Sequence, residues 1–438
     1  MKRPIRTVLG VAAAVSLALA GCSSGTDTPE AAPFPTGPVT ISLAGWSLST
    51  TPEFQTLADG FKALHPNVTV QLKEYDAANY DTQMIADLAA GTAPDIYVLK
   101  NLKNFVTYSD GGQLVDVSDV AGGLGDLGGL SAYAIDGKTY AVPYRQDSWV
   151  LYYNKDLFDK AGVDYPDGSW TWDDYAATAK ELTTGLKAAG SAAVGTYQHS
   201  WQSTAQGFAL AQTSGAELES GNFSYLKPYY TRVLDLQTAG AQPNFGTVTT
   251  NKLTYQAQFG KQQAAMLPMG TWYVATLIKQ RGTGDADTFN WGIAPAPQFS
   301  GSTAGTSNTP VTFGDPTGLG INPATADGER LAVAKAFLTY AAGEDAAKAL
   351  AGIGITPANT SDVVVQTYFG LDGVPADDLS KFAWSRHDTR PENPVSKHTA
   401  ALQNVLNDLH SAVLSGSTGI DDAIAQAQDR AKSEVLNQ

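Results

Sequence analysis

With 438 residues, the chain is long enough for two or three domains with sizeable apolar cores. Its residues are 43% hydrophobic and 16% charged, which is typical of a globular protein rather than of a disordered one. The formal net charge of −15 makes nucleic acid and anionic lipid headgroups poor partners, so a neutral or cationic ligand is favoured.

The first residues have the pattern of an exported lipoprotein. Basic residues within Lys2–Arg6 precede an apolar run at Val8–Ala20, which predicts a signal peptide at 1–21. Leu19-Ala20-Gly21-Cys22 resembles a bacterial lipobox, whose cysteine carries the lipid after cleavage. Because Cys22 is the only cysteine, we favour lipidation over a buried thiol. The sequence therefore predicts an extracytoplasmic protein that a lipidated Cys22 anchors to the outer face of the cytoplasmic membrane.

Residues 22–38 are small, polar and proline-rich, which predicts a flexible tether behind the lipidated cysteine. Beyond it, strand and helix patterns alternate, and this order predicts a parallel sheet covered by helices. Ligands bind beyond the carboxyl ends of such strands, which places Trp46 and the pair Lys100-Asn101 at the rim of a site. The expected strands are Val39–Leu43, Val68–Leu72 and Asp95–Leu99, and the expected helices carry Phe54 to Leu64 and Tyr80 to Leu88.

Several helix ends are marked by capping residues. Thr50 and Glu53 have the spacing of a capping box before the first helix, and Thr171 and Asp174 have nearly the same spacing. Further along, Asn154 can cap a short helix that a glycine ends eight residues later, at position 162.

Two apolar strands meet at a polar patch in the middle of the chain. A turn at Asp136–Lys138 leads into a strand at Thr139–Pro143, and a second strand runs over Trp149–Tyr153. Between them lie polar residues at 145–147. Taken alone, this pattern indicates two strands of one sheet that are joined by a polar bend. It is less typical of a chain that crosses between two bodies.

Motifs that would indicate catalysis or a cofactor are weak. Gly123–Gly128 spells G-x-G-x-x-G, but it lacks the preceding strand and following helix of a dinucleotide site, so we interpret it as a loop. The five histidines are scattered, and neither a G-x-S-x-G elbow nor a P-loop occurs. We therefore predict no catalytic residue, no metal and no cofactor. A glycosidase remains an alternative, because the separation of its two carboxylates is not visible in a sequence.

Four segments resemble one protein family. They are YAVPYRQDSWVLYYNKDLFDKAG at 140–162, FKALHPNVTV at 61–70, GTAPDIYVL at 91–99, and FGKQQAAM at 259–266 with the following Gly270-Thr271-Trp272 turn. All are similar to extracellular solute-binding proteins of carbohydrate ABC importers, the maltose-binding-protein-like family. The resemblance implies an α/β, two-lobed periplasmic-binding-protein type II fold with a hinge and a ligand cleft between the lobes. Crossings are expected near Gln146, Ala296 and Asn322, with 39–146 and 296–323 in the first lobe and 147–295 and 324–438 in the second.

The same resemblance implies where a carbohydrate would bind. Sugar C–H faces lie against aromatic rings while hydroxyl groups need polar partners, and a buried polar group without one costs roughly 1–3 kcal/mol. Asp147 is expected to reach sugar hydroxyls, although pairing with Arg145 is an equal alternative. Residues 196–201 are as compatible with a core strand end as with a ligand-facing loop. The expected ligand-binding residues are Trp46, Asn101, Gln146, Asp147, Tyr197, Trp272, Gly318 and Trp384.

The expected function is capture of a mono- or oligosaccharide by closure of the lobes, followed by delivery to ABC permease subunits. The resemblance further implies a monomer that is not an enzyme. The alternatives are a lipid-anchored, glycosidase-like carbohydrate-active enzyme and an anchored solute sensor.

Overall fold

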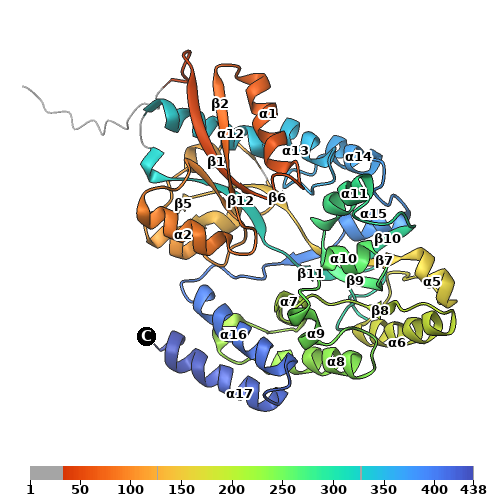
Figure 1. Cartoon of the computed structure of the whole chain (residues 1–438). Coiled ribbons are helices and arrows are strands. Elements are labelled where there is room, and N and C mark those ends of the chain that lie inside the picture. The colour runs from red at the N-terminus through yellow and green to blue at the C-terminus, as the bar shows by residue number, and fades with distance from the viewer. Residues whose placement is uncertain (1–32, 126, 326–327, 438) are drawn as a thin grey trace, which may run out of the picture.

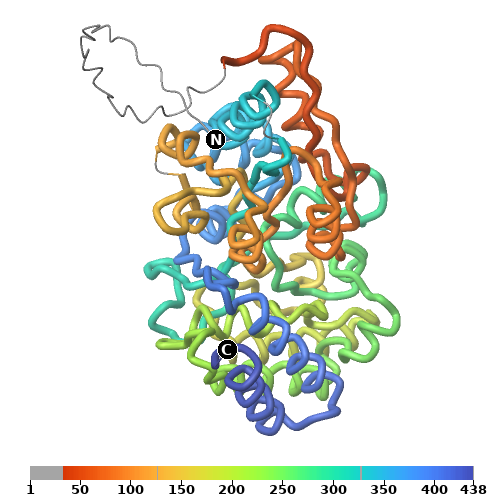
Figure 2. The backbone as a smooth tube through the Cα atoms, turned by 90° about the vertical axis from the view of Figure 1, so that its left-hand side faces the viewer, coloured from red at the N-terminus to blue at the C-terminus, as the bar shows by residue number. Residues whose placement is uncertain are grey.

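The computed structural model describes residues 33–125, 127–325 and 328–437, so the predicted signal peptide and Cys22 lie outside the described residues. The protein consists of two lobes, one above the other in Figures 1 and 2. Each lobe has its own sheet and its own apolar core, which confirms the expected two-lobed α/β fold. Within the described part of the chain, no helix has the length and apolar character needed to cross a membrane.

The first lobe is built on a five-stranded sheet in the order β2-β1-β3-β12-β6. Strand β1 is parallel to β2 and β3, whereas β12 runs antiparallel to β3 and β6. Helices pack on this sheet because their apolar residues recur at helical spacing, as Phe54, Leu57 and Phe61 do on α1. The strands are β1 (Val39–Trp46), β2 (Val68–Tyr75), β3 (Ile96–Leu99), β6 (Val142–Gln146) and β12 (Pro316–Ile321), with a hairpin of β4 (Ala134–Ile135) and β5 (Lys138–Thr139). The helices are α1 (Glu53–Leu64), α2 (Tyr80–Ala90), α3 (Phe105–Asp110), α4 (Ser118–Ala121), α12 (Gly328–Ala342) and α13 (Glu344–Ala351), with short helices at Leu130–Tyr133 and Pro323–Thr325.

The second lobe has a four-stranded sheet in the order β10-β7-β9-β8. The central strands β7 and β9 are buried along their whole length, as expected for strands covered by helices on both faces. The strands are β7 (Trp149–Asn154), β8 (Val194–Thr196), β9 (Ala264–Gly270) and β10 (Trp291–Pro295), with a separate pair of β11 (Val311–Phe313) and β13 (Asp388–Arg390). The helices are α5 (Lys155–Ala161), α6 (Trp172–Ala188), α7 (Ser203–Gln212), α8 (Lys227–Thr238), α9 (Phe245–Thr250), α10 (Tyr255–Gly260), α11 (Tyr273–Thr283), α14 (Asp362–Gly370), α15 (Asp378–Ser385), α16 (Thr399–Leu414) and α17 (Ile420–Arg430), followed by a π-helical turn at Ala431–Leu436; short helices lie at Leu218–Ser220 and Ser224–Leu226.

The predicted caps are confirmed at two of three helices. The Asn154 side chain accepts the N–H of Leu157, and Thr171 and Asp174 form both bonds of a capping box. The box expected at Thr50 and Glu53 is wrong, because α1 begins without a side-chain cap. The Glu53 carboxylate instead bonds residues of β6, as described below.

The chain passes between the lobes three times. The first crossing lies between Gln146, the end of β6, and Trp149, the start of β7. The second lies between Phe313 and Pro316, not near Ala296, because residues 296–313 stay on the second lobe: the Gln298 N–H donates to Trp170 at 3.0 Å.

The crossing expected near Asn322 is also wrong. The Asn322 side-chain amide donates to the carbonyls of Ala93 and Pro94, so this residue ends β12 inside the first lobe. Helix α12 then packs against β1 and contributes to the first core, which contradicts the assignment of 324–438 to the second lobe. The third crossing lies between Ile355, in the first core, and Val364, in the second.

The three crossings run side by side. Strand β6 pairs with β12 at Arg145 and Gln146, and on its other edge the Gln146 N–H donates to the Thr356 carbonyl at 3.2 Å. The Ala358 N–H likewise donates to the Tyr144 carbonyl at 3.1 Å. The connection between the lobes is therefore a narrow, hydrogen-bonded strap of three segments.

Candidate functional site

A cleft of about 580 Å³ lies between the lobes and is lined by residues of both. The first lobe contributes the loop after β1, the start of α1 and the end of β3. The second lobe contributes the loop before α7, the start of α10 and the turn after β9. The crossings at Arg145 and Gly314 also line it. This volume lies in the range of small-molecule binding sites.

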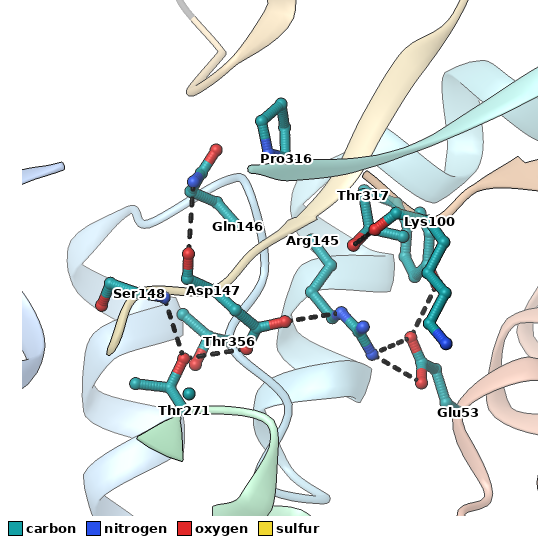
Figure 3. A network of polar contacts seen from close by, with 12 residues as sticks. Glu53, Lys100, Arg145, Gln146, Asp147, Ser148, Thr271, Pro316, Thr317 and Thr356 are labelled. Atoms are coloured by element: carbon teal, nitrogen blue, oxygen red, sulfur yellow. Dashed lines mark hydrogen bonds and ion pairs between the residues drawn. The ribbon is translucent and has the colours of Figure 1, made fainter. Parts of the chain in front are cut away.

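Beside the crossings, a chain of polar contacts joins the two lobes (Figure 3). The Arg145 Nη1 atom donates to both Glu53 carboxylate oxygens, at 2.8 and 2.9 Å, and its Nε atom is ion-paired with Asp147 Oδ2 at 2.8 Å. Glu53 also accepts the Tyr144 hydroxyl at 2.7 Å, and Thr271 Oγ1 donates to Asp147 Oδ1 at 2.8 Å. Glu53 belongs to the first lobe and Thr271 to the second, so Arg145 and Asp147 connect them.

Burial and neighbouring charges shift the pKa values of Arg145 and Asp147. Glu53, Arg145 and Asp147 are only 1%, 8% and 4% exposed. Burial raises the pKa of Asp147, and the neighbouring Arg145 charge opposes that rise. Burial alone would lower the pKa of Arg145, but the charges of Glu53 and Asp147 outweigh it and raise that pKa. Arg145 is therefore a permanent cation at the base of the cleft.

Aromatic rings form the wall of the cleft on the second lobe. Trp272 lies two residues after Gly270 and immediately before α11, and a Cβ at Gly270 would lie 1.8 Å from the Trp272 ring, so only glycine allows this turn. The Trp272 ring contacts Trp149 edge to face at 5.5 Å. Trp201 packs on Tyr255 at 5.7 Å and is 42% exposed. An exposed tryptophan beside a partly buried one offers ring faces to a ligand.

The wall on the first lobe has fewer aromatic rings. It consists of Trp46, the following residues Ser47, Thr50 and Thr51, and the pair Lys100-Asn101. Trp46 is 9% exposed because Phe54 and Tyr80 pack against it, both at 5.1 Å. The hydroxyl groups of Ser47, Thr50 and Thr51 and the Asn101 amide line this side together with the small residues Ala77 and Ala78.

A second carboxylate pair lies at the crossing between β11 and β12. Asp315 accepts the Leu102 N–H of the first lobe at 3.2 Å, and it accepts the Glu392 N–H and the Asn393 side-chain amide of the second at 2.9 and 2.6 Å. The Ser203 hydroxyl donates to Glu392. Burial, and then the Asp315 charge, raise the pKa of Glu392 to about 7.

The structure brings four of the eight expected ligand-binding residues into the cleft: Trp46, Asn101, Asp147 and Trp272. Lys100, expected at the rim, also lines it. Asp147 forms the ion pair with Arg145 that the sequence offered as the alternative to a ligand contact.

The other four expected residues lie outside the cleft lining. Gln146 points away from Arg145 and donates to the Asp147 carbonyl at 3.4 Å (Figure 3). Tyr197 is fully buried, and its hydroxyl donates to the Leu253 carbonyl. Trp384 stacks on Tyr368 in the core, and its indole N–H donates to Thr356. Gly318 lies in mid-strand, where a Cβ would be 2.7 Å from the Tyr133 ring, so its role is packing.

Several other residues that line the cleft were not among the ligand-binding residues predicted from the sequence. Glu53 was interpreted as a capping residue, and Asp315 and Glu392 come from segments without a recognisable motif. The planar residues at 196–201 did carry a signal, since His199 and Trp201 line the cleft. Across 33–125, 127–325 and 328–437, no group of three or more His, Cys, Asp or Glu side chains could hold a metal ion.

The fold and the cleft define a class of protein: a two-lobed α/β binding protein with its site between the lobes and three connecting segments. Residues 47–348 match the sequence model of bacterial extracellular solute-binding proteins, so the chain belongs to that family. The resemblance found in the sequence is thereby confirmed.

Individual relatives agree with this assignment. A sugar transporter from Rhizobium etli, whose crystal structure shows an open conformation, is 31% identical in sequence to this chain. The match covers 90% of this chain and 99% of that one, and the two structures superimpose with a TM-score of 0.75. A binding protein of Brucella abortus is 30% identical over 152 residues, which are 33% of this chain and 36% of that protein. The sn-glycerol-3-phosphate-binding periplasmic protein of Agrobacterium fabrum is 42% identical over 60 residues, 13% of this chain and 14% of its own. The matches to these two curated relatives thus span about a third or less of their length.

Proposed function

We propose that the protein is an extracytoplasmic sugar-binding protein that takes a mono- or oligosaccharide into the cleft between its lobes and delivers it to an ABC permease. The observation that carries this proposal is the composition of the cleft, with indole and phenol rings concentrated on the wall of the second lobe and hydroxyl and amide groups on both walls. A pyranose presents apolar C–H faces and a polar rim, so its binding needs both aromatic rings and hydrogen-bonding groups. The similarity to a sugar transporter supports the same ligand class.

The proposed mechanism is closure of the lobes around the sugar. A ligand that contacts both walls binds the closed form more tightly than the open one, and it shifts the equilibrium by that difference in affinity. The narrow strap of crossings allows the lobes to rotate as rigid bodies, as in hinge closure of periplasmic binding proteins. The closed molecule would then present its surface to the permease.

Trp272→Ala tests the site. Removal of this ring takes away the partly buried platform of the second lobe, so we expect sugar affinity to fall at least about tenfold, which is about 1.4 kcal/mol. Thermal-shift and calorimetric titration with a panel of mono- and oligosaccharides measures this. Trp170→Ala is the matched control, because Trp170 is a partly buried tryptophan of the same lobe outside the cleft. Equal sugar affinity of both variants would contradict the proposed site.

We also propose that Cys22 carries a lipid and anchors the protein outside the cytoplasmic membrane, as a monomer. The lipobox supports this proposal. Mass spectrometry of the native N-terminus, with Cys22→Ser as the control, should find a lipidated cysteine. A native chain that retains its signal peptide, or that begins with a free cysteine, would contradict it.

The two alternative functions differ in what happens to the sugar. A glycosidase-like enzyme would cleave it, whereas we expect chromatography to return every bound oligosaccharide intact. A sensor would bind without transport, whereas we expect deletion of this protein to abolish uptake of its sugar. Neither alternative is favoured by a feature of the cleft.

A further inference from the structure

Both cations that line the cleft are already engaged by the protein. Arg145 binds Glu53 through Nη1 and Asp147 through Nε, and it lies between them. Lys100 Nζ donates to the Ala77 carbonyl at 2.6 Å and lies 5.3 Å from the centre of the Trp46 ring. Among the described residues that line the cleft, these are the only lysine and arginine side chains.

Negative charge exceeds positive charge in the same space. Glu53, Asp147 and Asp315 line the cleft beside the two cations, and Glu392, whose pKa is raised to about 7, adds a partial negative charge near neutral pH. His199 adds no positive charge near neutral pH, because burial lowers its pKa to about 4. An anion that enters the cleft would leave water for a site that already holds more negative than positive charge.

The start of helix α1 does not compensate for this. The N-terminus of a helix attracts anions through its free N–H groups and its dipole. Here Glu53 is the first residue of α1, so the first turn already carries a carboxylate, although this carboxylate caps no N–H group of the helix. That carboxylate is held in place by Tyr144 and Arg145.

We propose that Glu53 and Asp147 determine ligand specificity: by occupying the guanidinium group of Arg145, they exclude phosphorylated and carboxylated ligands and restrict the cleft to uncharged carbohydrates. This inference rests on the proposed function and narrows it. It distinguishes between two classes of ligand, neutral and anionic. The relatives include both, since one relative is described as a sugar transporter and another as an sn-glycerol-3-phosphate-binding protein.

The first experiment compares matched ligands on the unchanged protein. Calorimetric titration uses glucose with glucose 6-phosphate and glucuronate, glycerol with glycerol 3-phosphate, and a panel of neutral oligosaccharides. We expect neutral sugars to bind and every anionic ligand to bind at least about tenfold more weakly than the tightest neutral sugar. An anionic ligand that binds as tightly as that sugar, or more tightly, would overturn the proposal.

The second experiment removes the two carboxylates that bind Arg145. In the variant Glu53→Gln/Asp147→Asn, both carboxylates are replaced by neutral groups of the same shape, so the guanidinium can pair with an added anion. We expect inorganic phosphate to raise the melting temperature of this variant and not that of the unchanged protein. If the double variant does not fold, Glu53→Gln alone provides the same comparison.

The matched control removes two carboxylates elsewhere. Asp119→Asn/Asp235→Asn makes the same change in net charge at exposed ion pairs with Lys335 and Lys180, at 2.7 and 2.5 Å. We expect phosphate to have no effect on this control. Equal stabilisation of both double variants, or of the unchanged protein, would overturn the assignment to Glu53 and Asp147.

The outcomes also separate this inference from the proposed function. If no sugar binds, neutral or charged, the proposed function is wrong, and the neutral-ligand inference fails with it. If anionic sugars bind best, the cleft is still a carbohydrate site and only the specificity is wrong.

Discussion

The pKa of Glu392 is raised because the group is buried and lies beside a second carboxylate. Burial and the Asp315 charge raise its pKa to about 7, whereas the Ser203 hydroxyl and Lys103 lower it. A raised folded-state pKa means that the folded protein binds this proton more tightly than the unfolded chain. The contribution of Glu392 to stability is therefore unfavourable once the group ionises, and it grows as pH rises from the ordinary glutamate range through about 7.

Glu392→Gln should remove this penalty. Glutamine resembles the protonated acid and can still accept the Ser203 hydroxyl, so we expect the variant to be more stable than the unchanged protein by about 1–2 kcal/mol at about pH 8, after allowance for the partial exposure of Glu392. The gain should shrink as pH falls and vanish below about pH 4, because Glu392 is then protonated in the folded and in the unfolded protein. Thermal melts across this range measure it. Glu217→Gln, at an exposed acid, is the control, and a gain that does not change with pH would contradict the argument.

At the scale of elements, strand alternation explains which predictions of the site succeeded. Along β6 and the crossing, Arg145 and Asp147 face the cleft, so Gln146 between them faces away. The prediction that Gly318 binds the ligand is wrong by the same rule, since its neighbour Thr317 is the residue of β12 that lines the cleft. The resemblance located the correct segments, and a shift of one residue separates a lining side chain from one on the opposite face.

Most elements were predictable because their signals are local. Apolar spacing predicted α1 and α2, and the caps at Asn154 and Thr171 are formed by neighbouring residues. The role of Glu53 was not predictable, because its partner Arg145 is 92 residues away and becomes a neighbour only when α1 packs beside β6. Trp384 was misplaced for the same reason: its partner Tyr368 belongs to another helix of the core.

At the scale of the whole molecule, the sequence predicted two lobes but misplaced two of the three crossings. The expected crossings near Ala296 and Asn322 came from the resemblance to the family. A strand that ends in a loop on its own lobe and one that leaves the lobe look alike in sequence, because the difference lies in long-range pairs such as Gln298 with Trp170. The crossing expected near Gln146 is the one that the structure confirms, since β6 ends at Gln146 and β7 begins at Trp149.

The strap of crossings and the contacts beside it determine how the lobes can move. Asp315 accepts hydrogen bonds from Leu102 of the first lobe and Asn393 of the second, and Lys103 Nζ donates to Asn404 on α16 at 2.9 Å. These bonds link the lobes close to the second crossing. We expect a rotation that preserves these bonds to pivot about the strap and to bring the walls of the cleft together when a ligand binds.

Distances between spin labels test this motion. The only natural cysteine is Cys22, so with Cys22→Ser a pair of cysteines introduced at Thr82 on α2 and Asn251 after α9, both exposed, labels one site on each lobe. We expect the distance between these labels, measured by double electron–electron resonance, to shorten when a sugar from the panel saturates the protein, since the sugar binds the closed form more tightly. A pair at Lys62 and Thr82, within the first lobe, should keep its distance. If saturating sugar left both distances unchanged, the protein would bind without closure, and the pivot inferred from Asp315 and the three crossings would be wrong.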